Sequence, residues 1–550
     1  MKKLVASLFC VAVLNLNANN EAVKITDKGF KVTLEWLDDK PKSYAKDFFI
    51  IQYLNQKDIT EEQAQLAYDM SRAKKGRVKK AFKKRFSKIP NKDLKCYQAS
   101  PKDLLLENSR CISLGLSISD ATSMSKDDVR TAIKKIKDYP TLANDLKIIA
   151  SDDTFNDLLN TDVNRFYRLF FNAGSKFRNN IINNNIPASF IDKISTHKKF
   201  NRFIAYVIHR GNLEKLQKSL FTVKNNNKIT HQTFFSLSLN AINHKEETVA
   251  LNYLKKAYYK AYFQSQKDKT LLWIYLLTQN KSFLQKVSQS WDNNVYSLYA
   301  KELLEVPIDN IHYDIDIPNT PSSYDTLDQF EWIKVTEDTK KNLNDKKLAK
   351  YTTLFTDSST LPHYAFVLER YYRYKKQYYI KPFRNIMKNY DINRQVLMYA
   401  IGRQESRFIP SSVSFATAQG VMQIMPFLSI ELAKKLKEPY NIYEQFLPEV
   451  NLRYANKHLD SLVKQFDNNP LFIAYAYNGG PGYTRKQFKR GLFKEKNRFE
   501  PFMSMEQISY AETRKYGRKV LTNYYIYNNH LNKENKVTLS SILQTLVLPN

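Results

Sequence analysis

Glu405, in the last third of the 550-residue chain, stands where a hydrophobic residue would be expected. It follows Leu397 and Ile401 in steps of four residues and precedes Phe408 by three, so the helical period places it on an apolar face. Burial disfavours the charged form of a carboxyl group and raises its pKa, which is the state that a general acid needs near neutral pH. We therefore take Glu405 as a candidate acid catalyst.

The helix that would carry this carboxyl group is expected to span residues 391–408, with Asp391 as its N-cap and Pro410 beyond its end. Arg403 and Arg407 are close in sequence to the glutamate. A surface carboxylate paired with one of these arginines is therefore the alternative to a catalytic acid, and the helix alone leaves both open.

A second glutamate, Glu512, also lies among apolar residues at helical spacing. The segment SMEQISYAETRKYGRKVL places five residues in steps of three and four, and so on one helix face: Met505, Ile508, Glu512, Tyr516 and Val520. For Glu512, a place in a substrate groove and a buried ion pair with a nearby arginine are the two alternatives.

Two glycine-bearing segments between these glutamates offer groups that could hold a polar substrate. Residues 416–426 read ATAQGVMQIMP, and residues 474–482 read AYAYNGGPG, in which the glycines and the proline force a loop after an apolar helix. They supply two amides, a thioether and a phenol: Gln423, Asn478, Met425 and Tyr477. Each segment alone is more typical of core packing, but the set in this order is specific.

Together these motifs resemble the soluble lytic transglycosylases, goose-lysozyme-like enzymes that cleave glycosidic bonds of bacterial peptidoglycan. The resemblance is carried by RQESRF around Glu405, by GVMQIMP, by AYNGGPG and by ETRKYGRKV, and it covers residues 378–521. Gly479 departs from the pattern, since the family more often has alanine there, a difference that we expect to be tolerated. The residues upstream show no motif that can be matched.

The resemblance implies roles for individual residues. Glu405 is expected to be the single catalytic acid and base, and Ser414 to orient the N-acetyl group of the substrate. The remaining positions are expected to bind substrate along the groove: Gln423, Met425, Tyr477, Asn478 and Glu512. One carboxyl group can serve both proton transfers, so no metal ion and no cofactor is expected.

The body that must position this site is expected to be helical. Only 12 of the 550 residues are glycine, about 2% where roughly 7% is usual, and apolar residues recur at spacings of three and four from about residue 23 to residue 304. Short helical stretches in succession indicate an irregular α-solenoid, with a plain globular helical domain as the alternative. Pro307, Pro318 and Pro321 then interrupt the helical pattern.

The family architecture implies an all-α fold, made of an α-superhelical U domain in the form of a solenoid or ring, a small helical linker domain and a lysozyme-like C-terminal catalytic domain. Whether the U domain closes into a ring is left open by the sequence. The boundaries expected are residues 1–18 for a signal peptide, 19–305 for the U domain, 306–380 for the linker region with the L domain, and 381–550 for the catalytic domain.

The N-terminus favours export. Residues 1–18 combine two lysines with an apolar run that is shorter than the roughly 20 residues needed to span a bilayer, which is typical of a secretory signal rather than of a membrane anchor. In an exported protein the two remaining cysteines, Cys96 and Cys111, are disulfide candidates, with two buried thiols as the alternative. We expect the mature protein in the periplasm, without a transmembrane anchor.

The net charge of +32, from 86 basic and 54 acidic residues, would by itself favour a polyanionic partner such as nucleic acid. Export argues against nucleic acid, and a cell-wall partner is expected instead, although a general bias toward lysine also explains such a charge. The partners expected are the glycan strands of peptidoglycan and, beyond these, cell-wall synthesis or other periplasmic proteins. We expect a monomer.

The predicted function is that of a peptidoglycan lytic exotransglycosylase, a carbon–oxygen lyase that leaves 1,6-anhydroMurNAc ends; internal cleavage of the strand stays open. A muramidase that uses water and a glycan-binding helical scaffold without catalysis are the alternatives.

Overall fold

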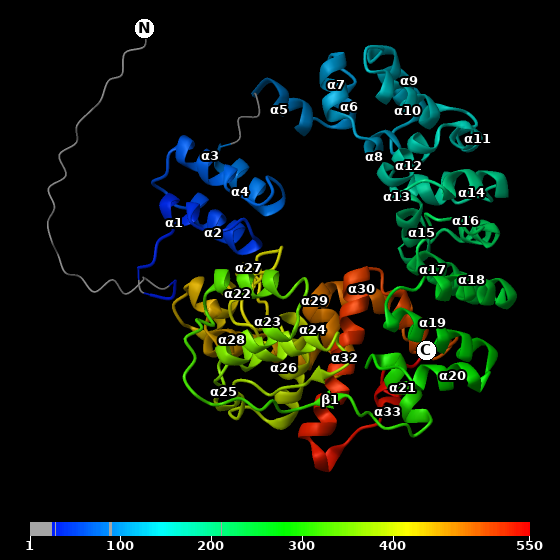
Figure 1. Ribbon diagram of the computed structural model, residues 1–550. Coiled ribbons are helices and arrows are strands. Elements are labelled where there is room, and N and C mark those ends of the chain that lie inside the picture. The colour runs from blue at the N-terminus through cyan, green and yellow to red at the C-terminus, as the bar shows by residue number, and fades with distance from the viewer. Residues whose placement is uncertain (1–24, 28, 87–90, 211) are drawn as a thin grey trace, which may run out of the picture.

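The computed structural model describes residues 25–27, 29–86, 91–210 and 212–550 (Figure 1). The predicted signal peptide lies outside these residues. The described chain is almost entirely helical; its one sheet is a parallel pair of two-residue strands, β1 Ile311–His312 and β2 Gln377–Tyr378, with Ile311 opposite Gln377. The prediction of an all-α fold is therefore confirmed. No described helix combines the length and the apolar character that crossing a membrane requires.

The helices of the N-terminal half follow one another along an arc that forms most of a ring (Figure 1). The arc begins with four helices that lie together: α1 Leu34–Asp38, α2 Tyr44–Leu54, α3 Glu61–Asp69 and α4 Gly76–Phe86. It continues through α5 Asn91–Gln98, α6 Pro101–Leu104, α7 Ser109–Gly115, α8 Ile118–Ala121, α9 Lys126–Lys135, α10 Pro140–Ala150, α11 Thr154–Asn160, α12 Val163–Asn172, α13 Ser175–Phe177, η1 Arg178–Ile182, α14 Ala188–Ser195, α15 Phe200–His209, α16 Glu214–Ser219 and η2 Leu220–Thr222. It ends with α17 His231–Asn243, α18 Glu247–Lys260, α19 Gln264–Thr278, α20 Lys281–Ser288 and α21 Val295–Leu303.

The rest of the chain lies between the two ends of this arc (Figure 1). Residues 306–323 contain no described helix, as the three prolines predict. Three helices follow, α22 Gln329–Asp338, α23 Asp345–Leu354 and α24 Leu361–Tyr371. The C-terminal part consists of α25 Arg384–Met387, α26 Ile392–Glu405, α27 Pro426–Leu436, η3 Tyr443–Phe446, α28 Pro448–Gln465, α29 Pro470–Gly479, α30 Pro481–Lys489, α31 Phe502–Gln507, α32 Ala511–Leu531, η4 Lys533–Asn535 and α33 Leu539–Gln544. The division into domains at residues 305 and 380 stays a prediction.

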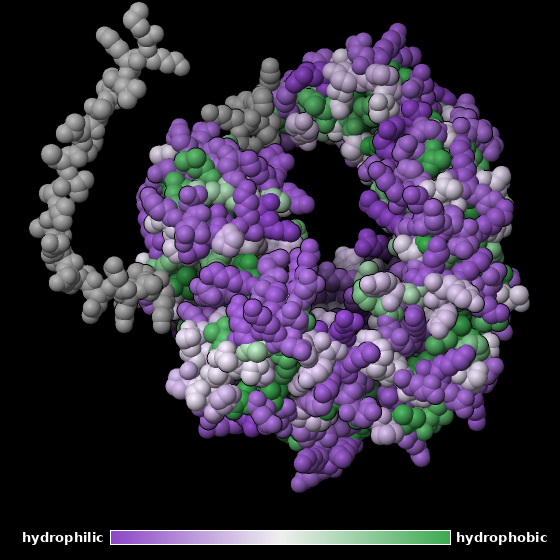
Figure 2. All heavy atoms as spheres, in the orientation of Figure 1, coloured by the Kyte–Doolittle hydropathy of each residue, from purple (hydrophilic) through white to green (hydrophobic). Residues whose placement is uncertain are grey.

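Aromatic side chains close the ring. Phe48 and Phe49 of α2 are buried, and they pack on Phe446 of η3 and on Phe330 of α22, with ring centroids 5.8 Å and 6.0 Å apart. This cluster is separate from the main core, which runs continuously through the arc and the C-terminal helices. The arc of the predicted U domain therefore does not close on itself; the ring is completed by the C-terminal part, which contacts both ends of the arc. The ring surrounds an opening whose rim is mainly hydrophilic in Figure 2.

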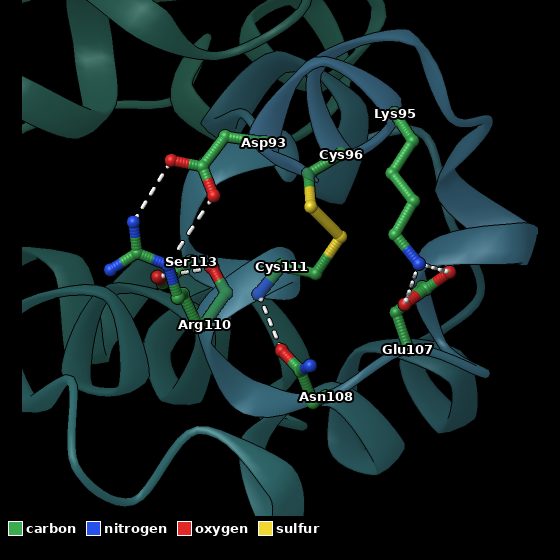
Figure 3. The surroundings of a disulfide bond; sticks show 8 residues. All are labelled: Asp93, Lys95, Cys96, Glu107, Asn108, Arg110, Cys111 and Ser113. Carbon is green, nitrogen blue, oxygen red and sulfur yellow. Dashed lines mark hydrogen bonds and ion pairs between the residues drawn. A yellow bond between two sulfur atoms is a disulfide. The ribbon is translucent and has the colours of Figure 1, made fainter. Parts of the chain in front are cut away.

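A disulfide joins Cys96 of α5 to Cys111 of α7, which confirms the predicted pair (Figure 3). The backbone N–H of Cys111 donates to Asn108 Oδ1 at 2.9 Å, so Asn108 caps α7. Arg110 and Asp93 form an ion pair across the same two helices at 2.9 Å. The bond therefore joins α5 covalently to α7, two short helices that both contribute buried residues to the main core.

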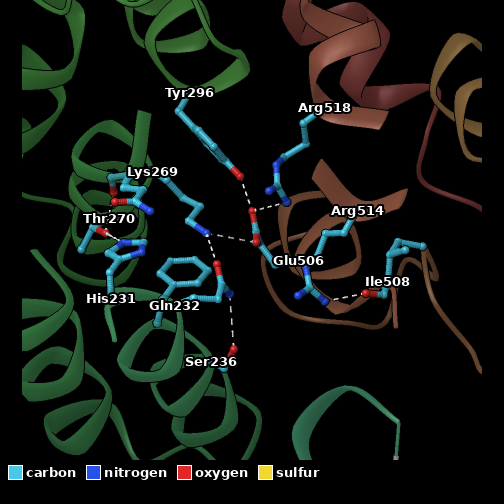
Figure 4. Close-up of polar contacts among 12 residues, drawn as sticks. His231, Gln232, Ser236, Lys269, Thr270, Tyr296, Glu506, Ile508, Arg514 and Arg518 are labelled. Carbon is cyan, nitrogen blue, oxygen red and sulfur yellow. Dashed lines mark hydrogen bonds and ion pairs between the residues drawn. The ribbon is translucent and has the colours of Figure 1, made fainter. Parts of the chain in front are cut away.

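A buried charge network ties the C-terminal helices to the end of the arc (Figure 4). Glu506 of α31 accepts hydrogen bonds from Arg518 of α32 at 2.8 Å, from Lys269 of α19 at 3.5 Å and, at short range, from Tyr296 of α21. Burial alone would raise the pKa of Glu506, but the charges of Arg518 and Lys269 lower it. Since removal of one member would leave a buried charge without its partner, the network fixes α32 against the arc.

Candidate active site

The helix that carries Glu405 begins as predicted. Asp391 is the N-cap of α26, and its carboxylate accepts from the backbone N–H of Arg394 at 2.9 Å. Residues from Val396 to Gly402 are all buried, so the helix lies in the core of the C-terminal part, where it packs on α32.

The end of α26 differs from the prediction. The helix stops at Glu405, three residues before Phe408, because Arg407 and Phe408 take left-handed backbone angles, with φ of 57° and 67°. This turn brings the Phe408 ring back onto the helix, where a Cβ at Gly402 would meet it at 2.9 Å. Glu405 therefore sits in the last turn of a helix, and its side chain is partly exposed rather than packed within the core.

The surroundings of Glu405 favour its protonated form. The Tyr516 hydroxyl donates to Glu405 Oε1 at 2.6 Å. Loss of hydration raises the pKa of Glu405 to about 8, the negative charge of Glu512 acts in the same direction, and the hydrogen bond from Tyr516 opposes both. The carboxyl end of a helix carries a partial negative charge, which also disfavours a carboxylate there. At neutral pH the group therefore holds a proton that it can donate.

The arginines near Glu405 do not pair with it. Arg403 donates to the buried carboxylate of Glu369 in α24 at 2.6 Å, and Arg407 forms a close ion pair with the other oxygen of the same group. Arg403 also donates to the carbonyl of Tyr378 at 2.6 Å. The alternative of a surface glutamate paired with Arg403 or Arg407 is therefore wrong, because both guanidinium groups are engaged elsewhere.

The segment after α26 folds as a tight turn beside the glutamate. Ser414 exchanges hydrogen bonds with Ala418: its backbone N–H donates to the carbonyl of Ala418 at 3.0 Å, and its hydroxyl accepts from the N–H of Ala418 at 3.0 Å. The Gln423 amide donates to the carbonyls of Ser412 at 3.1 Å and Gly420 at 2.9 Å. The amide nitrogen of Gln423 therefore braces the turn, which leaves its oxygen for a ligand.

Met425 occupies the N-cap position of α27 and is partly exposed. Ser406, next to the glutamate, donates through its hydroxyl to the carbonyl of Val421 at 2.7 Å. The turn is thereby tied directly to the end of α26, the helix that carries Glu405.

The end of α29 supplies a phenol and an amide, as predicted. The Tyr477 hydroxyl donates to the carbonyl of Met422 at 2.8 Å, and Asn478 Oδ1 accepts from the Thr513 hydroxyl at 2.7 Å. Burial raises the pKa of Tyr477, and the negative charge of Glu405 adds to the effect. Tyr477 therefore links the turn to α29 and stays a neutral phenol near the glutamate.

Gly479 has a local reason in this chain. A Cβ at this position would meet the ring of Tyr483 at 2.7 Å and the hydroxyl of Thr513 at 3.1 Å. Glycine, where the family more often has alanine, therefore fits the close packing of Tyr483 and Thr513 around this position.

The structure corrects the account of Glu512. The chain breaks between α31 and α32 at residues 508–510, so Met505 and Ile508 do not extend the face of α32. Glu512 lies in the first turn of α32 and is exposed, and among the described residues it forms no ion pair. The alternative of a buried pair with an arginine is therefore wrong. Glu512 remains a carboxylate at the surface whose charge reaches Glu405.

Two residues of the site were not expected to act on Glu405. Tyr516 appeared only as an apolar position on the helix of Glu512, although a buried phenol in the motif ETRKYGRKV was a usable signal. Glu369 carries no signal in the sequence, because it meets Arg403 and Arg407 only through the fold.

Among the described residues there is no cluster of three or more side chains suited to hold a metal ion.

Residues 381–499 match the family model described as transglycosylase SLT domain. The soluble lytic murein transglycosylase of Salmonella typhimurium is 34% identical over 160 residues, which cover 29% of this chain and 24% of that protein. The protein of the same name from Escherichia coli K12 is 28% identical over 241 residues, covering 39% of this chain and 37% of that protein. The chain thus spans well under half the length of these curated relatives.

Two solved structures were also matched. An inactive mutant of the lytic transglycosylase Slt from Pseudomonas aeruginosa matches with a TM-score of 0.44 and 16% identity, over 90% of this chain and 83% of that chain. The 70 kDa soluble lytic transglycosylase from Escherichia coli matches with a TM-score of 0.39 and 18% identity, over 92% and 84%.

Proposed function

We propose that the protein, whose residues 381–499 belong to the transglycosylase SLT domain family, is a lytic transglycosylase that cleaves the β-1,4 bond between MurNAc and GlcNAc in peptidoglycan. The observation that carries the proposal is Glu405, a partly exposed carboxyl group whose pKa is raised to about 8. Among the described residues, no other acid both lies in one of the four motif segments of the family and has a pKa raised to about 8.

In the first step Glu405 donates its proton to the oxygen between MurNAc and GlcNAc. This bond breaks, GlcNAc leaves with the proton, and the 2-acetamido group assists at the anomeric carbon of MurNAc. An acid with a pKa just above neutral is largely protonated at pH 7 and still transfers its proton readily, which is the match that general acid catalysis requires.

In the second step the carboxylate of Glu405 takes the proton of the MurNAc C6 hydroxyl, whose oxygen displaces the assisting acetamido oxygen from the anomeric carbon and closes the 1,6-anhydro ring. The Tyr516 hydroxyl, 2.6 Å from Glu405 Oε1, stabilises the carboxylate that exists between the two transfers. One carboxyl group thus serves both steps, whereas hydrolytic glycosidases usually need two. Glu512 is exposed and acts here only through its charge.

The other predicted residues would bind and orient the sugar. Ser414, on the turn that follows α26, would orient the N-acetyl group, and Met425 would offer an apolar surface to the sugar. Tyr477 and Asn478, at the end of α29, would define the opposite wall. Contacts of this kind accelerate the reaction to the extent that they strengthen at the transition state.

An exported, periplasmic enzyme fits the described structure. The disulfide between Cys96 and Cys111 is of a kind that persists in oxidising compartments such as the bacterial periplasm.

Mass spectrometry of the soluble products tests this function. The protein without residues 1–18 is incubated with purified peptidoglycan, in parallel with Glu405→Gln, which keeps the size of the side chain but cannot donate an acidic proton. Muropeptides that lack one water, formed only by the parent protein, support the proposal. Products with a reducing MurNAc end would instead mean a muramidase. Retained binding without products would mean a glycan-binding scaffold.

A further inference from the structure

Three exposed aromatic side chains follow one another where α18 ends and α19 begins, outside the residues assigned to the active site. Tyr259 in the last turn of α18 and Tyr262 in the connection are each 85% exposed, and no other aromatic side chain of the described residues is as exposed. Phe263 is 60% exposed, and its ring meets that of Tyr262 edge to face with centroids 5.0 Å apart. Tyr259, Tyr262 and Phe263 are called the aromatic turn below. Apolar groups exposed together in this way are typical of a binding surface.

The fold directs the aromatic turn away from the core. The buried face of α18 consists of Ala250, Tyr253, Leu254 and Ala257, and the helical period puts Tyr259 on the opposite face. In Figure 1, α18 also lies farther from the opening of the ring than α17. A ligand on this surface is therefore separate from a strand held in the active-site groove.

The backbone of the aromatic turn is held in place by side chains. Gln266 Oε1 accepts hydrogen bonds from the backbone N–H groups of Tyr262 at 3.0 Å and of Phe263 at 3.2 Å. Lys260 Nζ donates to the carbonyl of Asn226 at 3.0 Å, which ties the end of α18 to the segment before α17. Because the backbone is fixed before a ligand arrives, less conformational entropy is lost on binding.

The charge of the segment around the aromatic turn is positive. Residues 248–267 contain no acidic residue and four lysines, Lys255, Lys256, Lys260 and Lys267. Lys255 is exposed and precedes Tyr259 by one helical turn on the same face. Within the described part of the chain none of the four lysines forms an ion pair with a carboxylate. The surface therefore suits an anionic ligand that also presents flat apolar faces.

Peptidoglycan has both properties. The C–H faces of its sugar rings can stack on aromatic side chains, and the hydroxyl and acetamido groups at the ring edges can form hydrogen bonds with a phenol. Its peptide stems carry carboxylates, so the wall as a whole is anionic. Two of the three residues of the aromatic turn are tyrosines, whose hydroxyl groups suit a polar sugar better than a hydrocarbon surface.

We propose that the aromatic turn is a second glycan-binding site, which stacks on the sugar rings of a peptidoglycan strand and holds the enzyme on the wall while another strand lies in the groove. The inference rests on the proposed function for the identity of the glycan. Two sites on one polymer make the second contact intramolecular, so the intact wall is bound more tightly than a short oligomer, which fills the groove alone.

Two double variants of the arc test the proposal, both made in Glu405→Gln so that bound strands stay intact. Tyr259→Ser with Tyr262→Ser removes two rings from the aromatic turn. Tyr97→Ser with Leu106→Ser is the matched control, because it removes two side chains that are 55% and 85% exposed from another section of the arc. Binding is measured by co-sedimentation with insoluble sacculi. Calorimetry measures binding of long glycan strands freed of peptide by amidase and of short GlcNAc–MurNAc oligomers.

We expect the Kd for sacculi to rise about tenfold in the Tyr259/Tyr262 variant, the size expected for the loss of two aromatic contacts, and to stay within twofold in the control. The long peptide-free strands should also bind this variant more weakly, whereas the short oligomers should bind both variants and Glu405→Gln alone alike. Equal losses in both variants, or a loss that disappears once the peptides are removed, would overturn the proposal.

Two other occupants of the surface would be seen in the same proteins. Sedimentation velocity that shows a dimer in Glu405→Gln, lost only in the Tyr259/Tyr262 variant, would assign the surface to a second copy of the chain. Binding to phosphatidylglycerol vesicles that the same substitutions abolish would assign it to a membrane. Either result would overturn the proposal.

The second site and the catalytic function fail separately. If the parent protein releases no anhydro products but the Tyr259/Tyr262 variant loses affinity for sacculi, the second site stands and the catalytic assignment falls. If products form normally and the two variants bind sacculi alike, the second site falls alone. Thermal unfolding of all variants checks that these exposed substitutions leave the fold intact.

Discussion

Glu369 is predicted to control the proton of Glu405 without touching the substrate. Its buried carboxylate holds Arg403, which precedes Glu405 by two residues, and Arg407, which follows it by two. The replacement Glu369→Gln keeps an oxygen that can accept one hydrogen bond but removes the charge. The group formed by residue 369 and the two arginines then carries one more positive charge near Glu405.

The size of the effect follows from Coulomb's law. A unit charge roughly 10 Å from a carboxyl group, at an effective dielectric constant of ~20, stabilises the carboxylate by about 1.7 kcal/mol. This lowers the pKa of Glu405 from its value of about 8. The acid must be protonated to act, so activity is present below its pKa and is lost as the pH rises through it. The alkaline limb of the pH profile of kcat should move by about one pH unit to lower pH.

The assay is the initial rate of release of anhydro products between pH 5 and 10. A structural control is Asp145→Asn, since Asp145 of α10 is equally buried and also pairs with two arginines, Arg165 and Arg168. Both substitutions should lower the melting temperature, because removing one partner of a buried pair costs roughly 3 to 5 kcal/mol. Only Glu369→Gln should move the alkaline limb. A folded Glu369→Gln protein with the parental pH profile would refute the reasoning.

Three further variants separate the roles of other residues. Tyr516→Phe should lower kcat about tenfold or more, because a hydrogen bond to a charged group is worth roughly 1.5 to 3 kcal/mol. The same change should move the alkaline limb of the pH profile to higher pH, because the lost hydrogen bond had lowered the pKa of Glu405. An unchanged alkaline limb in rate measurements would contradict this. Glu512→Gln should leave the melting temperature unchanged and move the limb slightly to lower pH at low salt; a large loss of stability in calorimetry would return Glu512 to a structural role. Replacing Cys96 and Cys111 together by serine should destabilise the arc by about 3 kcal/mol in thermal unfolding. The product assay should show an unchanged kcat. Equal melting temperatures of the variant and the parent protein would speak against the bond.

The sequence predicts the site to the extent that its signals are local. Glu405 on an apolar helix, the Asp391 cap, and the phenol and amide at the end of α29 all follow from helical period and from glycine and proline placement. The disulfide followed from a count of cysteines in an exported chain. These features depend on residues within a few turns of one another, so that one sequence suffices to find them.

What the sequence missed depends on contacts between distant segments. The left-handed turn at Arg407 ends α26 early because Phe408 packs back on Gly402. The break before α32 exposes Glu512, although its spacing from Met505 and Ile508 suggested a continuous face. Such breaks are decided by tertiary packing, which periodicity does not report.

Ring closure was open for the same reason. The aromatic residues of α2 are visible in the sequence, but nothing near them names Phe330 or Phe446 as their partners. Glu369 likewise lies far from Arg403 in sequence and becomes its partner only in the folded chain.

The central claim is that Glu405 holds a proton at neutral pH, and difference infrared spectroscopy measures this directly. The spectrum of Glu405→Gln is subtracted from that of the parent protein at a series of pH values. We predict a band of a protonated carboxyl group that is present at pH 7 and disappears as the pH rises through about 8. A carboxylate signal already at pH 6, with no protonated band, would contradict the account.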